Sequence, residues 1–244
     1  MNHAANQLMS EPPLTGLRAL VVDDSAACRM MEAAMCRRLG AEAEVAETAI
    51  KAQALTAETR FDLLVLDIGL ADADGRVLCQ TIRDQGMCRT AAILCVSGLG
   101  GHDRRAAAIA AGADGFAEKP FDSVQAFAEA ATDVLAARGL GPQGPFAEAA
   151  EPAEPVSASV AAYALSDLKR AKKRLFSALA AGDVAGVRRT AHFLSGVAGV
   201  LNDKALGQAS NMVQSGDGDT AGLRAIEAML ARVAEATERL KTPA

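Results

Sequence analysis

The sequence predicts an α/β domain built on a five-stranded parallel sheet, followed by an all-α four-helix bundle. Three observations support this prediction. Short apolar runs alternate with helical patterns over residues 17–138, whereas residues 158–244 show helical patterns only. Between them, residues 139–157 are rich in Pro, Gly and Glu and contain no Lys or Arg, which is typical of a solvated linker. A chain of 244 residues is long enough for two modest domains.

The first domain alternates strands and helices in a regular order. The predicted strands cover residues 17–22, 42–45, 63–66, 92–96 and 115–117. The run at 63–66 reads LLVL, the continuous apolar stretch expected of a strand buried on both faces. The predicted helices cover residues 26–39, 48–59, 76–84, 103–111 and 123–137. This alternation implies a parallel sheet with helices on both faces.

The second domain carries helical patterns over residues 158–180, 184–201, 203–214 and 221–240. Asp183, Asn202 and Thr220 stand where helix N-caps are expected. Short polar or glycine-containing loops between helices of this length favour an antiparallel four-helix bundle. The basic run RAKKR at 170–174 is interpreted as a solvated helix face.

Charge and cysteine content exclude several classes of protein. The net charge of −5 and the pI of about 5.3 argue against bulk nucleic-acid binding, and no helix-turn-helix pairing is found. Residues 17–138 carry −5 and residues 158–244 carry +4, so the two domains are electrostatically suited to meet. Five cysteines without CxxC spacing indicate free thiols in a reducing cytoplasm. No run is long enough to span a membrane, and residues 1–16 are expected to be a disordered leader.

Polar residues gather at the strand ends of the first domain. Asp23 and Asp24 follow the first apolar run, Asp67 follows the third, Ser97 ends the fourth, and Lys119 lies just past the fifth. The carboxyl ends of parallel strands share one edge of a sheet, so these side chains are expected to meet there. Three carboxylates repel one another unless a hard cation such as Mg²⁺ joins them. A metal, an ammonium group and a hydroxyl beside a carboxylate suit phosphoryl transfer to that carboxylate.

The motifs around these strand ends resemble the receiver domain of two-component response regulators. They are LVVDDS at 20–25, LLVLDIGLADADG at 63–75, ILCVSG at 93–98 and GADGFAEKPF at 112–121. The resemblance covers about residues 17–138. It implies a doubly wound, flavodoxin-like sheet with the strand order 2-1-3-4-5.

The resemblance also implies a role for each site residue. Asp67 is the implied phosphoacceptor, and Lys119, before a cis Pro120, pairs with a phosphoryl oxygen. The implied switch residues are Ser97 and Phe116, although Phe116 lacks the hydroxyl of a tyrosine. The implied Mg²⁺ ligands are Asp23, Asp24, Asp67 and the backbone carbonyl of Gly69. Many relatives have a larger residue at the position of Gly69 and a proline at the position of Ala71, so the lifetime of the phosphoaspartate stays open.

His192 is the notable histidine of the second domain. It lies beside the apolar stripe of the helix predicted at 184–201. A neutral imidazole is a nucleophile, and nearby arginines attract a phosphoryl group. Two glycines inside a helix cost about 1 kcal/mol each, and the close approach of another molecule supplies a reason for them. The neighbours at helical spacing are Arg188, Arg189, Ser195, Gly196 and Gly199.

The segment AAGDVAGVRRTAHFLSGVAG at 180–199 resembles the histidine phosphotransfer domain, a four-helix bundle with the pattern AHxLKG. His192 then matches the phosphorylated histidine and Gly196 the glycine that follows it. Ser195 departs from the lysine that usually helps to hold the phosphoryl group. One hypothesis is that Arg188 or Arg189 replaces that charge. The alternative is a degenerate domain that docks partners without transferring phosphate.

Together the two resemblances imply a cytoplasmic phosphorelay protein. A sensor histidine kinase would phosphorylate Asp67, and His192 would pass phosphate to or from a receiver aspartate. No ATP-binding motif is present, so no ATP-dependent kinase activity of its own is expected. The 19-residue linker has a root-mean-square span of roughly 24 Å, which permits exchange within one chain. The competing hypothesis is an adaptor, in which phosphorylation releases or engages a docking or dimerisation module. The direction of phosphate flow and the oligomeric state stay open.

Overall fold

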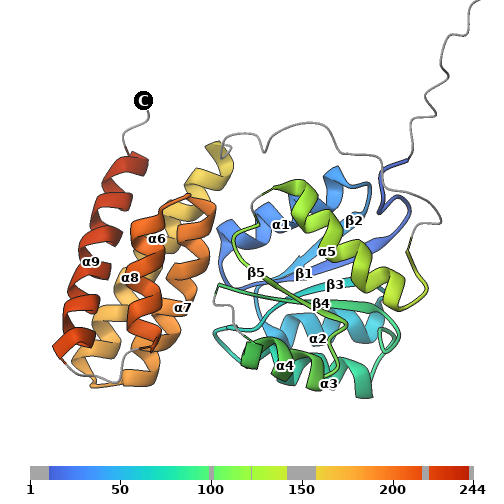
Figure 1. The fold of residues 1–244 in the computed structure, drawn as a ribbon, viewed down its shortest axis with the longest axis horizontal. Helices are drawn as coiled ribbons and strands as arrows, with labels where there is room; N and C mark the ends of the chain where they lie inside the picture. Colours follow the sequence, from blue (N-terminus) through green and yellow to red (C-terminus); the bar gives the residue numbers. More distant parts are fainter. Residues whose placement is uncertain (1–10, 99–101, 122, 142–157, 216–219, 242–244) are drawn as a thin grey trace, which may run out of the picture.

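The computed structural model describes residues 11–98, 102–121, 123–141, 158–215 and 220–241. In Figure 1 a sheet flanked by helices lies beside a group of long helices at the C-terminal end of the chain. We call the second part, α6 to α9, the helical region.

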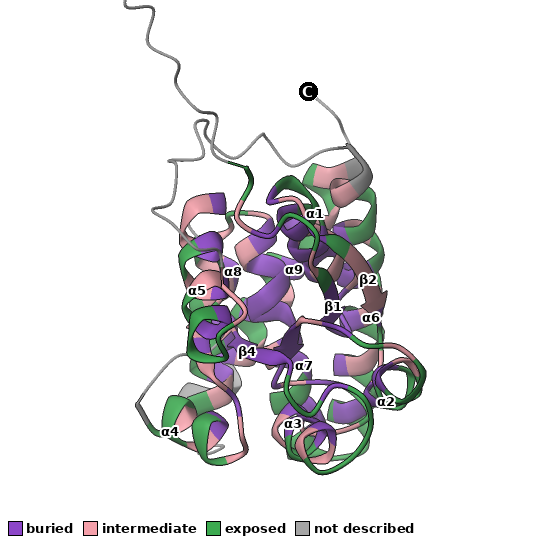
Figure 2. Ribbon diagram, turned by 90° about the vertical axis from the view of Figure 1, so that its right-hand side faces the viewer, coloured by how far each residue is buried: buried purple, intermediate pink, exposed green. Residues whose placement is uncertain are grey.

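The sheet is parallel throughout and its strand order is β2-β1-β3-β4-β5. This order confirms the predicted one. Leu64 lies opposite Leu20 on one side and Ile93 on the other, and all three are fully buried. In Figure 2 the centre of the sheet is correspondingly purple. The strands are β1 (Arg18–Val22), β2 (Glu42–Ala46), β3 (Leu63–Asp67), β4 (Ala92–Ser97) and β5 (Gly115–Glu118).

Helices cover both faces of the sheet. The helices α1 (Ala26–Arg38) and α5 (Val124–Ala137) pack on one face, where Cys36 and Phe127 join the core. The other face is covered by α2 (Ala49–Glu58), α3 (Gly75–Asp84) and α4 (His102–Ala110). Four of these helices have an N-cap residue whose side-chain oxygen accepts from a backbone N–H of the first turn: Ser25, Thr48, Asp74 and Ser123. Each cap fixes the residue at which its helix begins.

Residues 11–16 pack against the receiver-like sheet domain, which differs from the disordered leader predicted over residues 1–16. The Leu14 side chain is fully buried beside Leu39, and its backbone N–H donates to the Leu39 carbonyl at 2.8 Å. An apolar side chain that fills a gap at the end of α1 stabilises this segment. Residues 1–10 of the predicted leader lie outside the described residues.

The helical region consists of α6 (Ala158–Ala180), α7 (Val184–Val200), α8 (Lys204–Ser215) and α9 (Thr220–Lys241). Its interior is small and aliphatic, and includes Leu168, Leu194, Leu206 and Met229. The predicted cap of α7 is confirmed, because Asp183 Oδ1 accepts from the N–H of Gly186 at 2.8 Å. Most of the predicted linker, residues 142–157, lies outside the described part of the chain.

The predicted cap of α8 is wrong by one residue. Asn202 takes a left-handed conformation with φ of 51°, a conformation that asparagine tolerates better than most side chains. Asp203 is the residue whose carboxylate accepts from the N–H of Leu206, at 3.0 Å. The turn between α7 and α8 therefore needs both polar residues.

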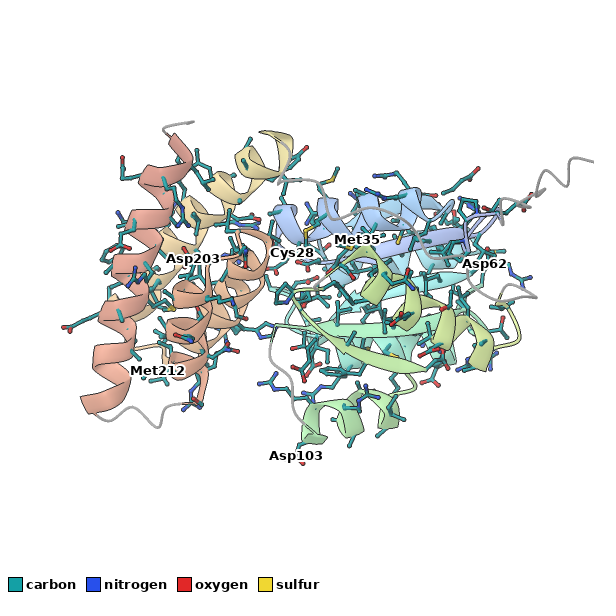
Figure 3. The ribbon with its side chains drawn as sticks, turned by 45° about the horizontal axis from the view of Figure 1, so that its top comes forward. Cys28, Met35, Asp62, Asp103, Asp203 and Met212 are labelled. Carbon is teal, nitrogen blue, oxygen red and sulfur yellow. The ribbon has the colours of Figure 1, made fainter. Side chains whose placement is uncertain are left out.

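The helical region packs against α1 of the sheet domain. Ala27 and Cys28 of α1 belong to the same buried apolar cluster as the interior of α6 to α9. Figure 3 shows Cys28 on the side of α1 that faces these helices. None of the described helices combines the length and the apolar composition that a membrane span requires.

Candidate functional site

The carboxyl edge of the sheet holds a buried ion cluster. Lys119, directly after β5, donates from Nζ to Asp23 Oδ2 at 2.7 Å and to Asp67 Oδ1 at 2.6 Å. The Lys119 side chain is 7% exposed and its two partners are less exposed still. Lys119 and Pro120 are joined by a cis peptide bond, as the resemblance implied. Ser97 is fully buried at the same edge, and its carbonyl accepts from the Lys119 N–H at 2.8 Å. The sequence prediction that these strand ends meet is confirmed.

Burial is the main influence on the acidity of two carboxyl groups in this cluster. Burial, followed by the charges of Asp67 and Asp24, raises the pKa of Asp23 to about 7 although Lys119 opposes the shift. Burial and Asp67 raise the pKa of Asp24 to about 6. Burial alone would lower the pKa of Lys119, but Asp23 and Asp67 outweigh it and hold that pKa well above its ordinary value.

Carboxylate oxygens are the donors that Mg²⁺ prefers, so the chemistry of Asp23, Asp24 and Asp67 fits the predicted cation. In the described part of the chain, however, no three His, Cys, Asp or Glu side chains converge in a metal-binding arrangement. Lys119 and an arginine of the helical region hold carboxylate oxygens instead. Gly69 donates its N–H to Asp67 Oδ2 at 2.8 Å. The ligand set stays a prediction.

Glu32 on α1 is a further buried carboxyl group, and the sequence analysis did not single it out. It is 1% exposed and neither carboxyl oxygen has a hydrogen-bond partner in the structure. Burial raises its pKa well above 4.5, although Lys119 opposes the shift. The group is therefore a local source of instability once it ionises.

Replacing Glu32 by methionine is expected to stabilise the protein by about 1–3 kcal/mol at pH 7, because an unpaired buried polar group is removed. The pKa of Glu32 is higher in the folded than in the unfolded chain, so the part of its cost that comes from ionisation is absent below about pH 4.5 and grows as the pH rises. Urea denaturation of both proteins from pH 4 to pH 8 checks this. A stability difference that is constant over this range would contradict it.

His192 lies directly over the ion cluster. Its Nε2 is 4.0 Å from Asp67 Oδ2, and its side chain is 12% exposed. Burial lowers the pKa of His192, against the attraction of Asp67, so the imidazole is neutral near pH 7. Nδ1 lies 3.1 Å from Gln214 Oε1, while the Gln214 amide nitrogen donates to the Ser210 carbonyl. With Gln214 Oε1 as the acceptor, we infer that Nδ1 carries the ring proton and that the lone pair of Nε2 lies toward Asp67.

Comparison with known families identifies the sheet domain. Residues 19–131 match the model of the response regulator receiver domain. These residues form a response regulator receiver domain. Domains of this family are phosphorylated on an aspartate, generally bind Mg²⁺ for that reaction and typically interact with sensor histidine kinases. The family match ends within α5, before the helical region begins.

Two curated relatives each match less than half of this chain. The chain is 30% identical over 105 residues to the DNA-binding dual master transcriptional regulator RpaA of Synechocystis sp., covering 43% of this chain and 44% of RpaA. It is 33% identical over 115 residues to the response regulator PleD of Caulobacter vibrioides, covering 46% of this chain and 24% of PleD. The chain thus spans less than half the length of these relatives. A CheY-like receiver domain protein from Methanospirillum hungatei JF-1 aligns at 25% identity with a TM-score of 0.46, over 50% of this chain and 96% of that one.

An aspartate of the helical region binds the N-terminus of α1 of the receiver domain. Asp167 Oδ2 accepts from Ser25 Oγ and from the Ala27 N–H, both at 2.9 Å. Its other oxygen pairs with Arg170 at 2.7 Å, and the Asp167 side chain is almost fully buried. A carboxylate at a helix N-terminus is favoured by the unpaired N–H groups and by the helix dipole. The sequence analysis did not single out this aspartate as a contact residue.

Two arginines of α6 reach Asp24. Arg170 donates to the Asp24 carbonyl at 2.6 Å, and Arg174 pairs with Asp24 Oδ2 at 3.2 Å. Both guanidinium groups also lie over the ring of Phe193, next to His192. The interpretation of residues 170–174 as a solvated face is therefore wrong for these two arginines, because the receiver domain covers that face of α6.

The arginines that the sequence analysis favoured lie elsewhere. Arg188 is exposed, and Arg189 pairs with Asp183 at 3.2 Å while most of its side chain faces solvent. The helical region therefore presents its positive charge to the acidic cluster from α6 rather than from the helix of His192. Phe116, the implied switch aromatic, is buried on the α2–α4 side of the sheet.

Proposed function

We propose that the protein is a phosphorelay intermediary in which Asp67 accepts a phosphoryl group and His192 exchanges it with Asp67. In this proposal the helical region is a histidine phosphotransfer bundle, and a sensor histidine kinase is the phosphodonor. The observation that carries the proposal is the 4.0 Å separation between His192 Nε2 and Asp67 Oδ2.

The transfer step needs no proton to move. The lone pair of His192 Nε2 forms the N–P bond as the bond between phosphorus and the Asp67 oxygen breaks, and the electron pair of that bond returns to the carboxylate. The Nδ1 proton stays on the ring and is bound by Gln214 Oε1, which stabilises the positive charge that the ring acquires. Attacking and leaving atoms that face each other suit the in-line geometry of phosphoryl transfer.

Lys119 and Arg174 supply positive charge near the reacting atoms. Lys119 already bonds Asp67, and Arg174 lies on the neighbouring Asp24. When Mg²⁺ is bound to the aspartates, it neutralises charge on the phosphoryl oxygens. The low exposure of Asp67 and His192 also keeps water away from the acyl phosphate.

Labelled acetyl phosphate with Mg²⁺ tests the proposal on the full chain, without an unidentified kinase. Wild-type protein is expected to carry base-labile label on Asp67 and acid-labile label on His192. Asp67→Asn should carry neither, whereas His192→Gln should keep only the base-labile label. Asp84→Asn, which changes an exposed aspartate of the same domain, is the matched control. Base-labile label alone in the wild type would favour the adaptor hypothesis.

A further inference from the structure

Glycines lie at several close approaches between the receiver domain and the helical region. A Cβ atom added to Gly69 would overlap the imidazole ring of His192. A Cβ atom added to Gly98 would overlap Oγ of Ser195. Both glycines follow strands of the receiver domain, one after β3 and one after β4. The side chains of His192 and Ser195 therefore occupy space that is open only because residues 69 and 98 are glycines.

The helical region has the reciprocal feature. A Cβ atom added to Gly196 would lie 3.2 Å from Sγ of Cys28, and one added to Gly199 would lie 2.8 Å from Cβ of Pro120. Nothing within α7 itself explains why glycine stands at these two positions. The close contact with the receiver domain of the same chain explains both. Surfaces fitted to each other at this many points tolerate little added volume.

We propose that the helical region docks selectively on the receiver domain of its own chain, and that Gly69, Gly98 and Ser195 determine this selectivity. A receiver domain with a side chain at either glycine position is disfavoured, because that side chain would force His192 or Ser195 out of the place that it occupies here. Selective docking names the receiver domain of the same chain as the partner with which His192 exchanges phosphate. This consequence for phosphate transfer rests on the proposed function.

Ser195 is then an adaptation to docking rather than a lost lysine. Its side chain is buried, and its hydroxyl donates to the His192 carbonyl at 2.7 Å, so it needs no partner from the receiver domain. A lysine at this position would direct a long side chain at Gly98. It would also bring a second ammonium group into the neighbourhood of Lys119, whose Nζ lies 3.9 Å from a Cβ atom added to Gly196. Both effects oppose docking.

The charged contacts provide affinity but less selectivity. Asp167 binds a helix N-terminus, and Arg170 binds a backbone carbonyl, groups that a different receiver domain with the same fold also offers. Discrimination between similar partners needs an element that repels the wrong one. The steric fit at Gly69 and Gly98 supplies that element.

Disulfide trapping measures docking without any phosphate. Gly196→Cys places a thiol beside Cys28, and the 3.2 Å between its Cβ atom and Cys28 Sγ, tight for a non-bonded contact, suits a disulfide bond. Oxidised glutathione as the oxidant is expected to join the two within one chain at a rate independent of protein concentration, and this parent is the reference for every further variant. Gly69→Ala, Gly98→Ala and Ser195→Lys, each added to Gly196→Cys, are expected to slow trapping roughly tenfold or more, since added volume at a fitted contact is costly.

Two controls accompany these variants. Ser166→Lys adds the same charge on an exposed position of α6 and should trap at the parent rate. Cys28→Ser should abolish the bond. Circular dichroism and urea denaturation show whether each variant is folded. If Gly69→Ala does not fold, a folded Gly98→Ala is sufficient for the test.

Parent-like trapping in folded Gly98→Ala and Ser195→Lys would overturn the inference, and so would a covalent dimer in place of the internal bond. Trapping that responds as expected in a protein that never labels His192 would leave the docking inference standing and remove the proposed relay. The two failures are therefore distinguishable.

Discussion

Replacing Lys119 by methionine is expected to destabilise the receiver domain by roughly 3–5 kcal/mol, because removing one partner of a buried ion pair leaves the other charge uncompensated. Lys119 is the cation that touches both Asp23 and Asp67, at 2.7 and 2.6 Å. Burial and the neighbouring carboxylates already raise the pKa of Asp23 to about 7 in the presence of the lysine. Without it, the cluster must take up protons or open to water.

Urea denaturation of the full chain at pH 7 with a chelator measures this effect. The control is Lys51→Met, which removes a lysine paired with Glu47 on the surface, where both side chains are about half exposed. That change is expected to cost less than about 1 kcal/mol. Added Mg²⁺ should stabilise Lys119→Met more than the wild type, since Asp23 and Asp67 then lack the lysine that joins them. Equal stability of Lys119→Met and Lys51→Met would show that Lys119 does not hold the cluster together.

The acidic site was predictable because it depends on local signals. An apolar run that ends in Asp67, or is followed by Asp23, places a carboxylate at a strand end, and parallel strands end at one edge. The position of these residues at the sheet edge does not depend on how side chains far apart in the sequence pack together. The same reasoning placed Lys119 after β5, and the structure confirms it.

The docked site was not predictable in the same way. His192 was singled out by its helical neighbours, but nothing local shows that it faces Asp67 of the same chain. Gln214 binds its ring from a different helix, 22 residues away, so no spacing rule connects the two. The tautomer of His192, and with it the nucleophilic nitrogen, depends on how α7 packs on α8.

The sequence of α6 does indicate which face of the helix makes the contact, but an interpretation based on the charge of the whole run misses it. Asp167, Arg170 and Arg174 are spaced three and four residues apart, which places them on one side of a helix. The run at 170–174 is basic as a whole, and basic runs on helices are usually solvated. Separating the residues by helical face, rather than by composition, distinguishes the two arginines that bind Asp24 from the lysines between them.

Replacing Asp167 by alanine is expected to weaken docking of the helical region by roughly 1.5–3 kcal/mol, the usual contribution of hydrogen bonds to a charged group. Its carboxylate accepts from Ser25 Oγ and the Ala27 N–H and pairs with Arg170, all within 2.9 Å. Alanine leaves the Arg170 guanidinium without its carboxylate and the α1 N-terminus without its second acceptor. Ser25 still caps α1, so the receiver domain should stay folded.

Hydrogen exchange at the Ala27 amide reports this loss directly, because that N–H is covered only while Asp167 is docked on it. Faster exchange is expected at Ala27 and at neighbouring amides of the first turn of α1 in Asp167→Ala, with a smaller change in Asp167→Asn, which keeps one acceptor oxygen. Asp203→Ala is the matched control, since it removes the aspartate that accepts from the Leu206 N–H inside the helical region, away from the receiver domain. Unchanged protection of Ala27 in Asp167→Ala would mean that the apolar contacts of Ala27 and Cys28 hold the two parts together without the aspartate.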